Sequence, residues 1–327
     1  MGQKEDNLFN KAKKSLKVRL SLVMLLIVGI VFAGIGLMVY FYVLKEESHP
    51  LAGPMFVGLL ILSLAMIVFL MIRSARNMKE LGEITAVKER MENELKIAKG
   101  IQMSMIPKIF PPYPERGDID IFASIDPAKE VGGDLFDFFI MDDKLYFCIG
   151  DVSGKGVPAS LVMAVTRSLF RTVAAHEKSP GRIVTAMNES MSDMNESTMF
   201  VTFFCGVLDM NTGHLRYCNA GHNAPVLLNT AKALLPVVSN VPLGIVAGTV
   251  FQEQETDLKY DDALFLYTDG VTEAENAKHE LFGEERMVDA LSGLRGSKAW
   301  PLSLMTNDSE CSRMMASMST RPSVPLG

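Results

Sequence analysis

Residues 144–156, KLYFCIGDVSGKG, decide the fold, because an apolar run there ends in an aspartate and a glycine-rich turn. The run Lys144–Ile149 is rich in aromatic and branched residues, which is typical of a strand. Gly156-Val157-Pro158 then begins a predicted helix, since proline is tolerated in the first helical turn. Asp151 is therefore expected at the end of a strand, beside glycines that let another group approach the backbone closely.

Two further motifs have the same character. Gly132-Gly133-Asp134 and Thr268-Asp269-Gly270 each place an aspartate beside glycine next to an apolar run. Each aspartate alone is also compatible with an ordinary turn or a helix cap. Three carboxylates brought together from strand ends repel one another unless a cation lies between them. The combination of Asp134, Asp151 and Asp269 therefore predicts a divalent metal site.

The glycine-rich turn does not match a nucleotide phosphate loop. That loop needs the pattern G-x-x-x-x-G-K-[ST]. The spacing from Gly150 to Gly154 is one residue short, and Gly156 stands where Ser or Thr is required. Nucleotide binding by this route is therefore rejected.

The sequence around these motifs predicts an α+β sandwich. Helices are expected from Gly156 onward and over Arg182–Met194, and Asp142-Asp143 is expected to form a hairpin turn. Strands are expected at Ile119–Ile125, Leu135–Met141, Lys144–Ile149, Phe200–Leu208, His214–Asn219, Pro225–Leu228, Val250–Thr256 and Ala263–Tyr267. Strands, two helices and strands again favour a sandwich over βαβ repeats.

Composition limits the class of protein. The 327 residues allow two domains, and 48% hydrophobic residues favour membrane segments. A net charge of −6 argues against a nucleic-acid partner. The four cysteines form no C-x-x-C pair, which disfavours a zinc site and a disulfide framework and favours a reducing compartment.

The N-terminal part predicts a transmembrane hairpin. Residues 20–44 and 51–72 are two apolar runs, joined by the short loop 45–50. The basic N-terminus, residues 1–19, and the basic residues after 72 place both termini in the cytoplasm of a multi-pass protein of the inner membrane. A signal peptide followed by a buried helix is the alternative, but the first run is too long and no A-x-A site follows. The hairpin serves either as a plain anchor in the lipid or as a sensor of the bilayer or a membrane partner.

Residues 73–106 predict a connector helix. They are charged and free of proline until Pro107, which breaks the helix. A heptad-like apolar stripe runs along the helix through Ile84, Val87, Met91, Ala98, Ile101 and Met105. The stripe is compatible with a coiled-coil homodimer or with packing of the helix on its own domain.

Five motifs in order resemble the SpoIIE/RsbU-type branch of the PPM serine/threonine phosphatases, over about residues 95 to 290. The leading helix end, with its Ile101-Gln102 pair, resembles that branch too. The motifs are Val131-Gly132-Gly133-Asp134-Leu135-Phe136-Asp137, Asp151-Val152-Ser153-Gly154-Lys155-Gly156, Met199-Phe200-Val201-Thr202, Asn219-Ala220-Gly221-His222 and Tyr267-Thr268-Asp269-Gly270-Val271-Thr272-Glu273-Ala274. The resemblance assigns residues 107–293 to the phosphatase domain.

The resemblance implies an αββα sandwich that holds two Mn²⁺ or Mg²⁺ ions. It implies that Asp151 bridges the ions with help from the Val152 carbonyl, that Asp134 lies on the same side, and that Asp269 holds the other ion. These three aspartates are the predicted catalytic residues, acting through a metal-activated water that attacks phosphorus without a phosphoenzyme. The implied substrates are phosphoserine or phosphothreonine on small proteins, often anti-sigma-factor antagonists of the STAS type. The predicted function is thus a membrane-anchored phosphatase in partner-switching signalling.

Three nearby residues have open roles. His222 is either a proton donor or phosphate contact, or part of a structural turn with Asn219 and Gly221. Lys155 is either a phosphate contact or a solvated loop residue. Asp137 is expected to support a metal ligand rather than to be one.

The C-terminus departs from the family pattern. Members normally close with Asp-Asp-[Ile/Met]-Thr on a last strand, and this motif is absent; Asp308 lacks the right setting. Residues 294–327 show no strand pattern, which indicates either divergence or a late change of reading frame. Loss of a carboxylate and a core strand is expected to weaken one metal and to destabilise the sandwich. The alternative function is therefore a catalytically impaired pseudophosphatase that acts as a scaffold for a phosphoprotein.

Overall fold

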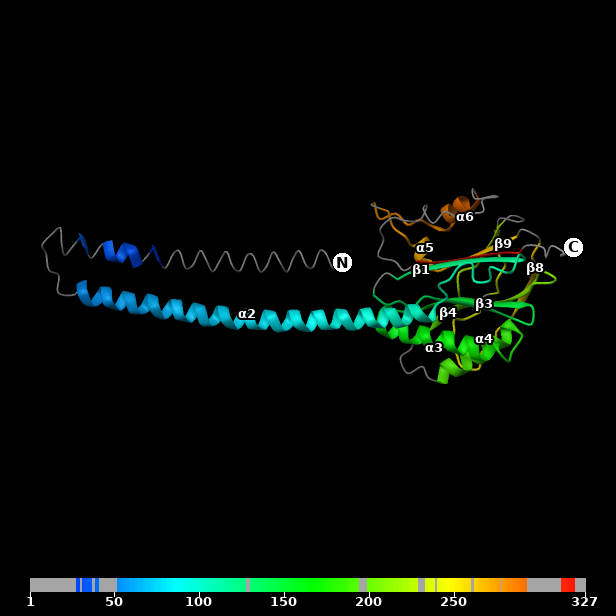
Figure 1. The fold of residues 1–327 in the computed structure, drawn as a ribbon, viewed down its shortest axis with the longest axis horizontal. Helices are drawn as coiled ribbons and strands as arrows, with labels where there is room; N and C mark the ends of the chain where they lie inside the picture. The colour runs from blue at the N-terminus through cyan, green and yellow to red at the C-terminus, as the bar shows by residue number, and fades with distance from the viewer. Residues whose placement is uncertain are drawn as a thin grey trace. The chain divides into compact units, whose positions relative to one another are not determined.

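The computed structural model describes residues 28–29, 31–36, 39–40, 52–127, 130–193, 199–228, 233–238, 240–259, 262–276, 278–292 and 313–320. The chain divides into two units, Met1–Met91 and Glu92–Gly327. Figure 1 shows the helices and strands within these ranges, and the second unit contains every described strand.

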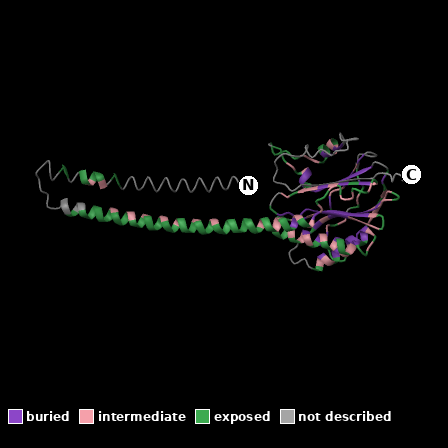
Figure 2. Ribbon diagram, viewed as in Figure 1, coloured by how far each residue is buried: buried purple, intermediate pink, exposed green. Residues whose placement is uncertain are grey.

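The first unit contains most of helix α2 (Ala52–Met105). Within the described residues, Val57–Met105 is one helix that is long and apolar enough to cross a membrane by length and composition, with a mean hydropathy of 2.4 in its most apolar window. Figure 2 shows most of α2 as exposed. This helix includes residues 52–72 of the second predicted span, residues 51–72, and Leu51 lies outside the described residues. Residues 1–19, the loop 45–50 and most of the first predicted span lie outside the described residues, so the hairpin and its orientation stay predictions.

The predicted connector is helical and continuous with the preceding apolar run, since α2 has no break before Met105. Pro107 follows two residues later and disfavours further helix. Ile84, Val87, Met91 and Ile101 of the predicted stripe are 64%, 59%, 59% and 56% exposed. These four side chains are exposed, and both interpretations of the stripe, a coiled-coil homodimer and packing of the helix on its own domain, stay predictions.

The second unit is a sandwich of two five-stranded sheets. Neighbouring strands of the first sheet are antiparallel throughout, with the strand order β2-β3-β4-β5-β8. These strands are β2 (Leu135–Met141), β3 (Lys144–Val152), β4 (Val201–Asp209), β5 (His214–Ala220) and β8 (Gln254–Asp257). The second sheet has the order β1-β10-β9-β6-β7. Its strands are β1 (Ile119–Asp126), β10 (Arg313–Thr320), β9 (Ala263–Tyr267), β6 (Val226–Leu228) and β7 (Ala233–Leu234).

Helices cover both outer faces. Helices α3 (Val157–Ala174) and α4 (Pro180–Asp193) lie on the first sheet, whereas α5 (Asp269–Thr272) and α6 (Glu284–Ser292) lie on the second (Figure 1). The αββα sandwich is therefore confirmed, as are the predicted strands, although Val250–Thr256 shortens to β8 and β7 was not predicted. Asp142 and Asp143 have φ angles of 52° and 56°, as a tight hairpin turn between β2 and β3 requires.

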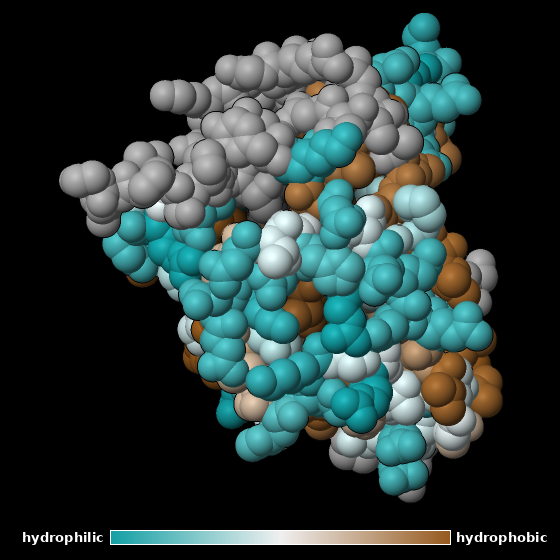
Figure 3. All heavy atoms as spheres, turned by 90° about the vertical axis from the view of Figure 1, so that its right-hand side faces the viewer, coloured by the Kyte–Doolittle hydropathy of each residue, from teal (hydrophilic) through white to brown (hydrophobic). Residues whose placement is uncertain are grey.

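The core follows from the alternation of side chains along each strand. One face of the first sheet packs on α3, where the Phe170 and Phe203 rings lie 6.1 Å apart. The opposite face packs on the second sheet, and a single buried cluster joins Phe204 with Leu264 and Leu266. The face of the domain seen in Figure 3 is mostly hydrophilic, with smaller hydrophobic areas. The apolar side chains are thus gathered mainly between the layers.

The prediction that the tail contains no strand is wrong. β10 is paired along its whole length with β1 and also with β9, so it is an inner strand of the second sheet. Strand pairing satisfies the backbone N–H and C=O groups of these residues, so β10 needs little β propensity of its own. Its sequence alternates apolar Met314, Ala316 and Met318 with Ser317 and Ser319, but it contains a single β-branched residue, Thr320, so the strand pattern is weak. Its sequence still contains no carboxylate, and Asp308 lies outside the described residues. The family's final aspartate therefore has no counterpart within this strand.

Candidate metal centre

A cavity of about 360 Å³ lies where strands of both sheets end. It is lined by three aspartates, by one glutamate and by residues of two glycine-rich loops. The lining residues are Val131, Gly132, Gly133, Asp134, Asp151, Val152, Ser153, Gly154, Lys155, Phe200, Thr202, Asp269, Gly270 and Glu273. The four residues predicted as metal ligands, Asp134, Asp151, Val152 and Asp269, are thus all brought to one cavity.

Each aspartate reaches the cavity from a different segment. Asp151 is the last residue but one of β3, and it follows Gly150, whose α-carbon faces Phe203 and therefore the helix layer. Because neighbouring side chains of a strand point to opposite faces, Asp151 points toward the second sheet. Asp134 immediately precedes β2, and Asp269 begins α5 directly after β9. The three aspartates line one cavity only because the sandwich brings both sheets together.

The electrostatics of the cavity favour a cation. Burial raises the pKa of Asp134 well above its ordinary range, and the charge of Asp151, a hydrogen bond with Asp151 and the charge of Asp269 raise it further. Burial and the charge of Asp269 also raise the pKa of Asp151 to about 6. Thr268 donates a long hydrogen bond of 3.5 Å from Oγ1 to Asp134 Oδ2. Carboxylates that oppose one another's ionisation in this way are stabilised by a divalent cation.

The donor set fits a hard divalent cation with an open coordination shell. Among the described residues, no three His, Cys, Asp or Glu side chains converge into a complete ligand group. The cavity instead offers carboxylate oxygens from three segments together with the Val152 backbone, and Mg²⁺ sites of this type keep several water ligands. Asp134, Asp151, Val152 and Asp269 are accordingly the residues that would hold the metal.

Gly133 brings the two loops into contact. A Cβ atom at this position would lie 2.8 Å from the Val152 carbonyl oxygen and 3.3 Å from Asp151 Oδ1. Backbone atoms cannot move away as easily as a flexible side chain, so only glycine fits here. The close approach holds the Gly132–Asp134 loop against the end of β3.

We expect Gly133→Ala to lower the affinity for Mn²⁺ by roughly 10- to 100-fold, the range typical of disturbed residues that support metal ligands. The added methyl group displaces either Asp134 or the Val152 carbonyl from its position. Calorimetric titration of the metal-free protein with Mn²⁺ measures the effect. Gly117→Ala is the matched control, because a Cβ atom at Gly117 meets nothing within 4 Å. Equal affinity of both variants would show that the loop contact is not needed.

His222 lies in a buried turn. Its backbone N–H donates to Asn219 Oδ1 at 2.7 Å, and Asn219 Nδ2 donates to its carbonyl at 2.8 Å. Its Nδ1 lies 2.9 Å from Thr202 Oγ1, and burial lowers its pKa to about 4. His222 does not line the cavity. These contacts support the alternative that His222 is part of a structural turn with Asn219 and Gly221. Its imidazole is neutral at pH 7 and contacts Thr202.

Asp137 does not support the metal ligands. It lies on the helix-facing side of β2, where Arg171 donates to it through Nε and Nη2, both at 2.6 Å. Arg167 Nη2 lies 3.0 Å from the same carboxylate. Asp137 therefore joins α3 to the first sheet, and the expectation that it supports a metal ligand is corrected.

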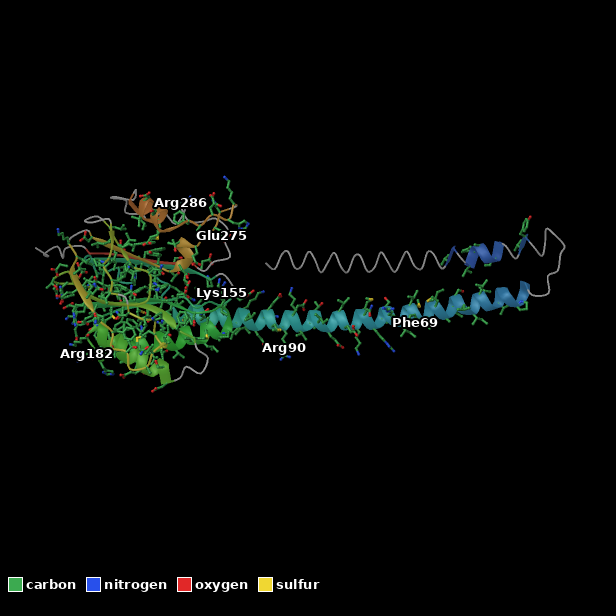
Figure 4. All side chains as sticks on the ribbon, turned by 180° about the vertical axis from the view of Figure 1, so that it is seen from behind. Phe69, Arg90, Lys155, Arg182, Glu275 and Arg286 are labelled. Atoms are coloured by element: carbon green, nitrogen blue, oxygen red, sulfur yellow. The ribbon has the colours of Figure 1, made fainter. Side chains whose placement is uncertain are left out.

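Lys155 lines the cavity from the turn between β3 and α3, and Figure 4 shows it at the edge of the domain. Its charge lowers the pKa of Asp151 and so opposes the larger effect of burial. Sequence reasoning assigned no role to Thr202 or Glu273, which also line the cavity. Thr202 belongs to the motif Met199-Phe200-Val201-Thr202, and Glu273 belongs to the motif that follows Asp269. Their places in these motifs are the sequence feature that could have indicated a position at the site.

Comparison with known proteins gives one family and several relatives. Residues 141–305 match the model of the family described as Stage II sporulation protein E (SpoIIE). Protein IcfG from Synechocystis sp. is 30% identical over an alignment of 248 residues, and the match covers 66% of this chain and 38% of IcfG. Phosphoserine phosphatase RsbU from Bacillus subtilis is 25% identical over an alignment of 215 residues, and the match covers 64% of this chain and 63% of RsbU. The chain therefore spans less than two thirds of the length of either protein.

A solved structure supports the same comparison. The RsbU and RsbW domains of Rv1364c from Mycobacterium tuberculosis superpose with a TM-score of 0.53 and 26% sequence identity. The match covers 64% of this chain and 61% of that one. It extends the similarity from sequence motifs to the arrangement of the sandwich.

Proposed function

The chain belongs to the SpoIIE family, and from this premise we propose that it is a metal-dependent protein phosphatase that hydrolyses phosphoserine or phosphothreonine. One observation carries the proposal. Asp134, Asp151 and Asp269 arrive from three separate segments at a single cavity that is also lined by Val152. Relatives named phosphoserine phosphatase support the choice of substrate class.

The residues of the cavity have separable tasks. Asp134 and Asp151, with the Val152 backbone, would hold a cation from the first sheet, and Asp269 would hold it from the second sheet. When bound, Mn²⁺ or Mg²⁺ supplies an activated water, orients the phosphate ester and neutralises developing charge. Lys155 attracts the phosphate dianion to the mouth of the cavity. Residues 132–134 and 153–155 line the cavity in which the ester would bind.

A scaffold without turnover is the second candidate. The observation that favours it is β10, whose sequence contains no carboxylate that could stand for the final aspartate of the family pattern. In that case, the cavity would bind a phosphoprotein without hydrolysing it. The presence of β10 weakens this candidate, because the second sheet keeps an inner strand that was not predicted from the sequence.

The test is hydrolysis of an aryl phosphate and of a phosphoserine protein by the purified full chain, before and after metal chelation. We expect turnover that disappears on chelation and returns when Mn²⁺ or Mg²⁺ is added in excess. No turnover from folded, metal-loaded protein would contradict the phosphatase and favour the scaffold. Turnover that resists complete removal of metal would contradict both the metal centre and the proposed chemistry.

We further propose that α2 anchors the phosphatase in the cell membrane and that its substrate is a STAS-type protein of a partner-switching pathway. The apolar stretch of α2 supports the anchor by length and composition. The joined RsbU and RsbW domains of Rv1364c support a signalling context. Fractionation of cells checks the anchor: we expect the chain in membranes after alkaline washing, and recovery in the wash would exclude it. A phosphorylated STAS protein that the active enzyme leaves untouched would argue against that partner class.

A further inference from the structure

Gln102 makes an unusual pair of contacts near the end of α2. Its side chain is only 6% exposed. Its Nε2 donates to the Gly132 carbonyl oxygen at 2.7 Å, and the Gly132 N–H donates back to its Oε1 at 3.2 Å. A carboxamide is the side-chain group that offers a donor and an acceptor in one plane, so it pairs with a peptide group as a neighbouring strand would. Gln102 therefore satisfies both backbone polar groups of Gly132.

Gly132 lies in the loop that carries Asp134, so the two hydrogen bonds with Gln102 act on that loop. The ladder between β2 and β3 begins at Leu135, opposite Gly150, so Gly132 lies outside it. Gly132 is two residues before Asp134, and Gly133 lies against Val152. The loop that carries Asp134 is thus held on one side by the end of β3 and on the other by a side chain of α2.

The end of α2 has anchors of its own. Ile106, just after the helix, is 4% exposed and belongs to the main core, and Met103 packs against that core. Loss of the Gln102 hydrogen bonds therefore leaves these apolar contacts in place. A substitution of Gln102 therefore removes the hydrogen bonds to the loop without removing the apolar contacts that Met103 and Ile106 make with the core.

We propose that Gln102 is a positioning residue that couples the last turns of α2 to the metal-binding loop and so sets the affinity for metal through Asp134. The inference rests on the proposed metal-dependent function and adds a means of regulating it. A movement of the helix end that withdraws the carboxamide frees Gly132 and loosens Asp134. The competing view is that Gln102 is a buried polar residue whose hydrogen bonds only stabilise the fold.

The experiment compares Gln102→Met with Gln252→Met in the full chain. Methionine keeps the length of the side chain and removes both hydrogen bonds, and Gln252 is an exposed glutamine for the same substitution. Amide hydrogen exchange is first measured on metal-free protein. We expect exchange at Gly132 to accelerate on the order of 10-fold in Gln102→Met, with the strands of the sandwich unchanged.

Calorimetric titration with Mn²⁺ is the second measurement. We expect the affinity to fall by roughly 10- to 100-fold in Gln102→Met, with a thermal midpoint close to that of Gln252→Met. Excess Mn²⁺ is expected to restore kcat with KM unchanged. Gln102→Asn, whose carboxamide is one methylene too short to reach Gly132 in the same way, is expected to reproduce the loss should methionine impair folding.

Unchanged exchange at Gly132 together with unchanged Mn²⁺ affinity would overturn the proposal. A lower Mn²⁺ affinity that is accounted for by a loss of stability of the whole domain would also overturn the proposal. That result is expected if Gln102 only stabilises the fold. The exchange measurement needs neither metal nor turnover. A wild-type chain that fails to bind Mn²⁺ would contradict the proposed function and the coupling to metal, while accelerated exchange would still establish the contact with the loop.

Discussion

Asp151→Asn is expected to reduce turnover by about 10³-fold or more while the domain remains folded. Asp151 is the carboxylate that β3 contributes to the lining of the cavity. Removing its charge weakens cation binding, and metal ions contribute several kcal/mol to the stabilisation of such transition states. Each 1.36 kcal/mol corresponds to about a tenfold change in rate. Steady-state kinetics at saturating Mn²⁺ measure the loss.

The same substitution, which lowers turnover, is not expected to lower the stability of the metal-free protein. Burial and Asp269 raise the pKa of Asp151 to about 6, so the folded state binds its proton more tightly than the unfolded chain, whose aspartates titrate near about 4. The stability from that proton is complete below the unfolded pKa and is lost as pH rises through about 6. At pH 7.5 without metal, Asp151→Asn should therefore unfold at the same temperature as wild type or higher.

Asp142→Asn is the control, because Asp142 lies in an exposed turn with a φ of 52°, which asparagine tolerates. It should retain full turnover and the stabilisation by Mn²⁺. Asp151→Asn with wild-type kinetics would remove Asp151 from the site. The thermal midpoint of Asp151→Asn shows whether the variant is folded. Loss of turnover counts as loss of a metal ligand only if the variant is folded.

Asp137→Asn is expected to destabilise the domain by roughly 2–3 kcal/mol, at or below the lower end of the cost of breaking a buried ion pair. The Asp137 side chain is completely buried between Arg167 and Arg171, which are 19% and 43% exposed. The partial exposure of Arg171 reduces the penalty, because water solvates the guanidinium once its partner is gone. For a domain of this size, the thermal midpoint should fall by about 5–10 °C.

The comparison is Asp142→Asn, which removes the ion pair of Asp142 with Lys178 at 3.5 Å. Both members of that pair are more than half exposed, so its loss is expected to cost less than about 1 kcal/mol. Chemical denaturation of both variants measures the difference. Equal stabilities would show that the contacts of Asp137 with α3 contribute little. Folded Asp137→Asn should keep its affinity for Mn²⁺, since Asp137 faces away from the cavity.

Much of the sandwich could be predicted from local patterns. The Asp142-Asp143 turn fixes the β2–β3 hairpin, because two adjacent residues with positive φ match the twist of the flanking strands. The inner strand β10 was not predicted, because its apolar alternation is short and poor in β-branched residues and its pairing depends on the edges that β1 and β9 present. The hairpin in the membrane rests largely on residues outside the described part of the chain and stays a prediction.

The part of the site that could be predicted from the sequence consists of residues that lie in short motifs. Asp134, Asp151 and Asp269 each stand beside glycine at the end of a strand-like run, and the sandwich gathers them as expected. The contacts of Gln102 with Gly132 and of His222 with Thr202 were not predictable. They join residues that are 30 and 20 positions apart, and no local pattern specifies such pairings.

Manganese anomalous diffraction from crystals grown with Mn²⁺ tests the central claim most directly. We predict anomalous density in the cavity within coordination distance of Asp151, Asp134 and Asp269. A second peak near Asp269 should be weaker than the first, because β10 supplies no further carboxylate. Crystals of folded protein that bind Mn²⁺ elsewhere, with no density between these aspartates, would contradict the account.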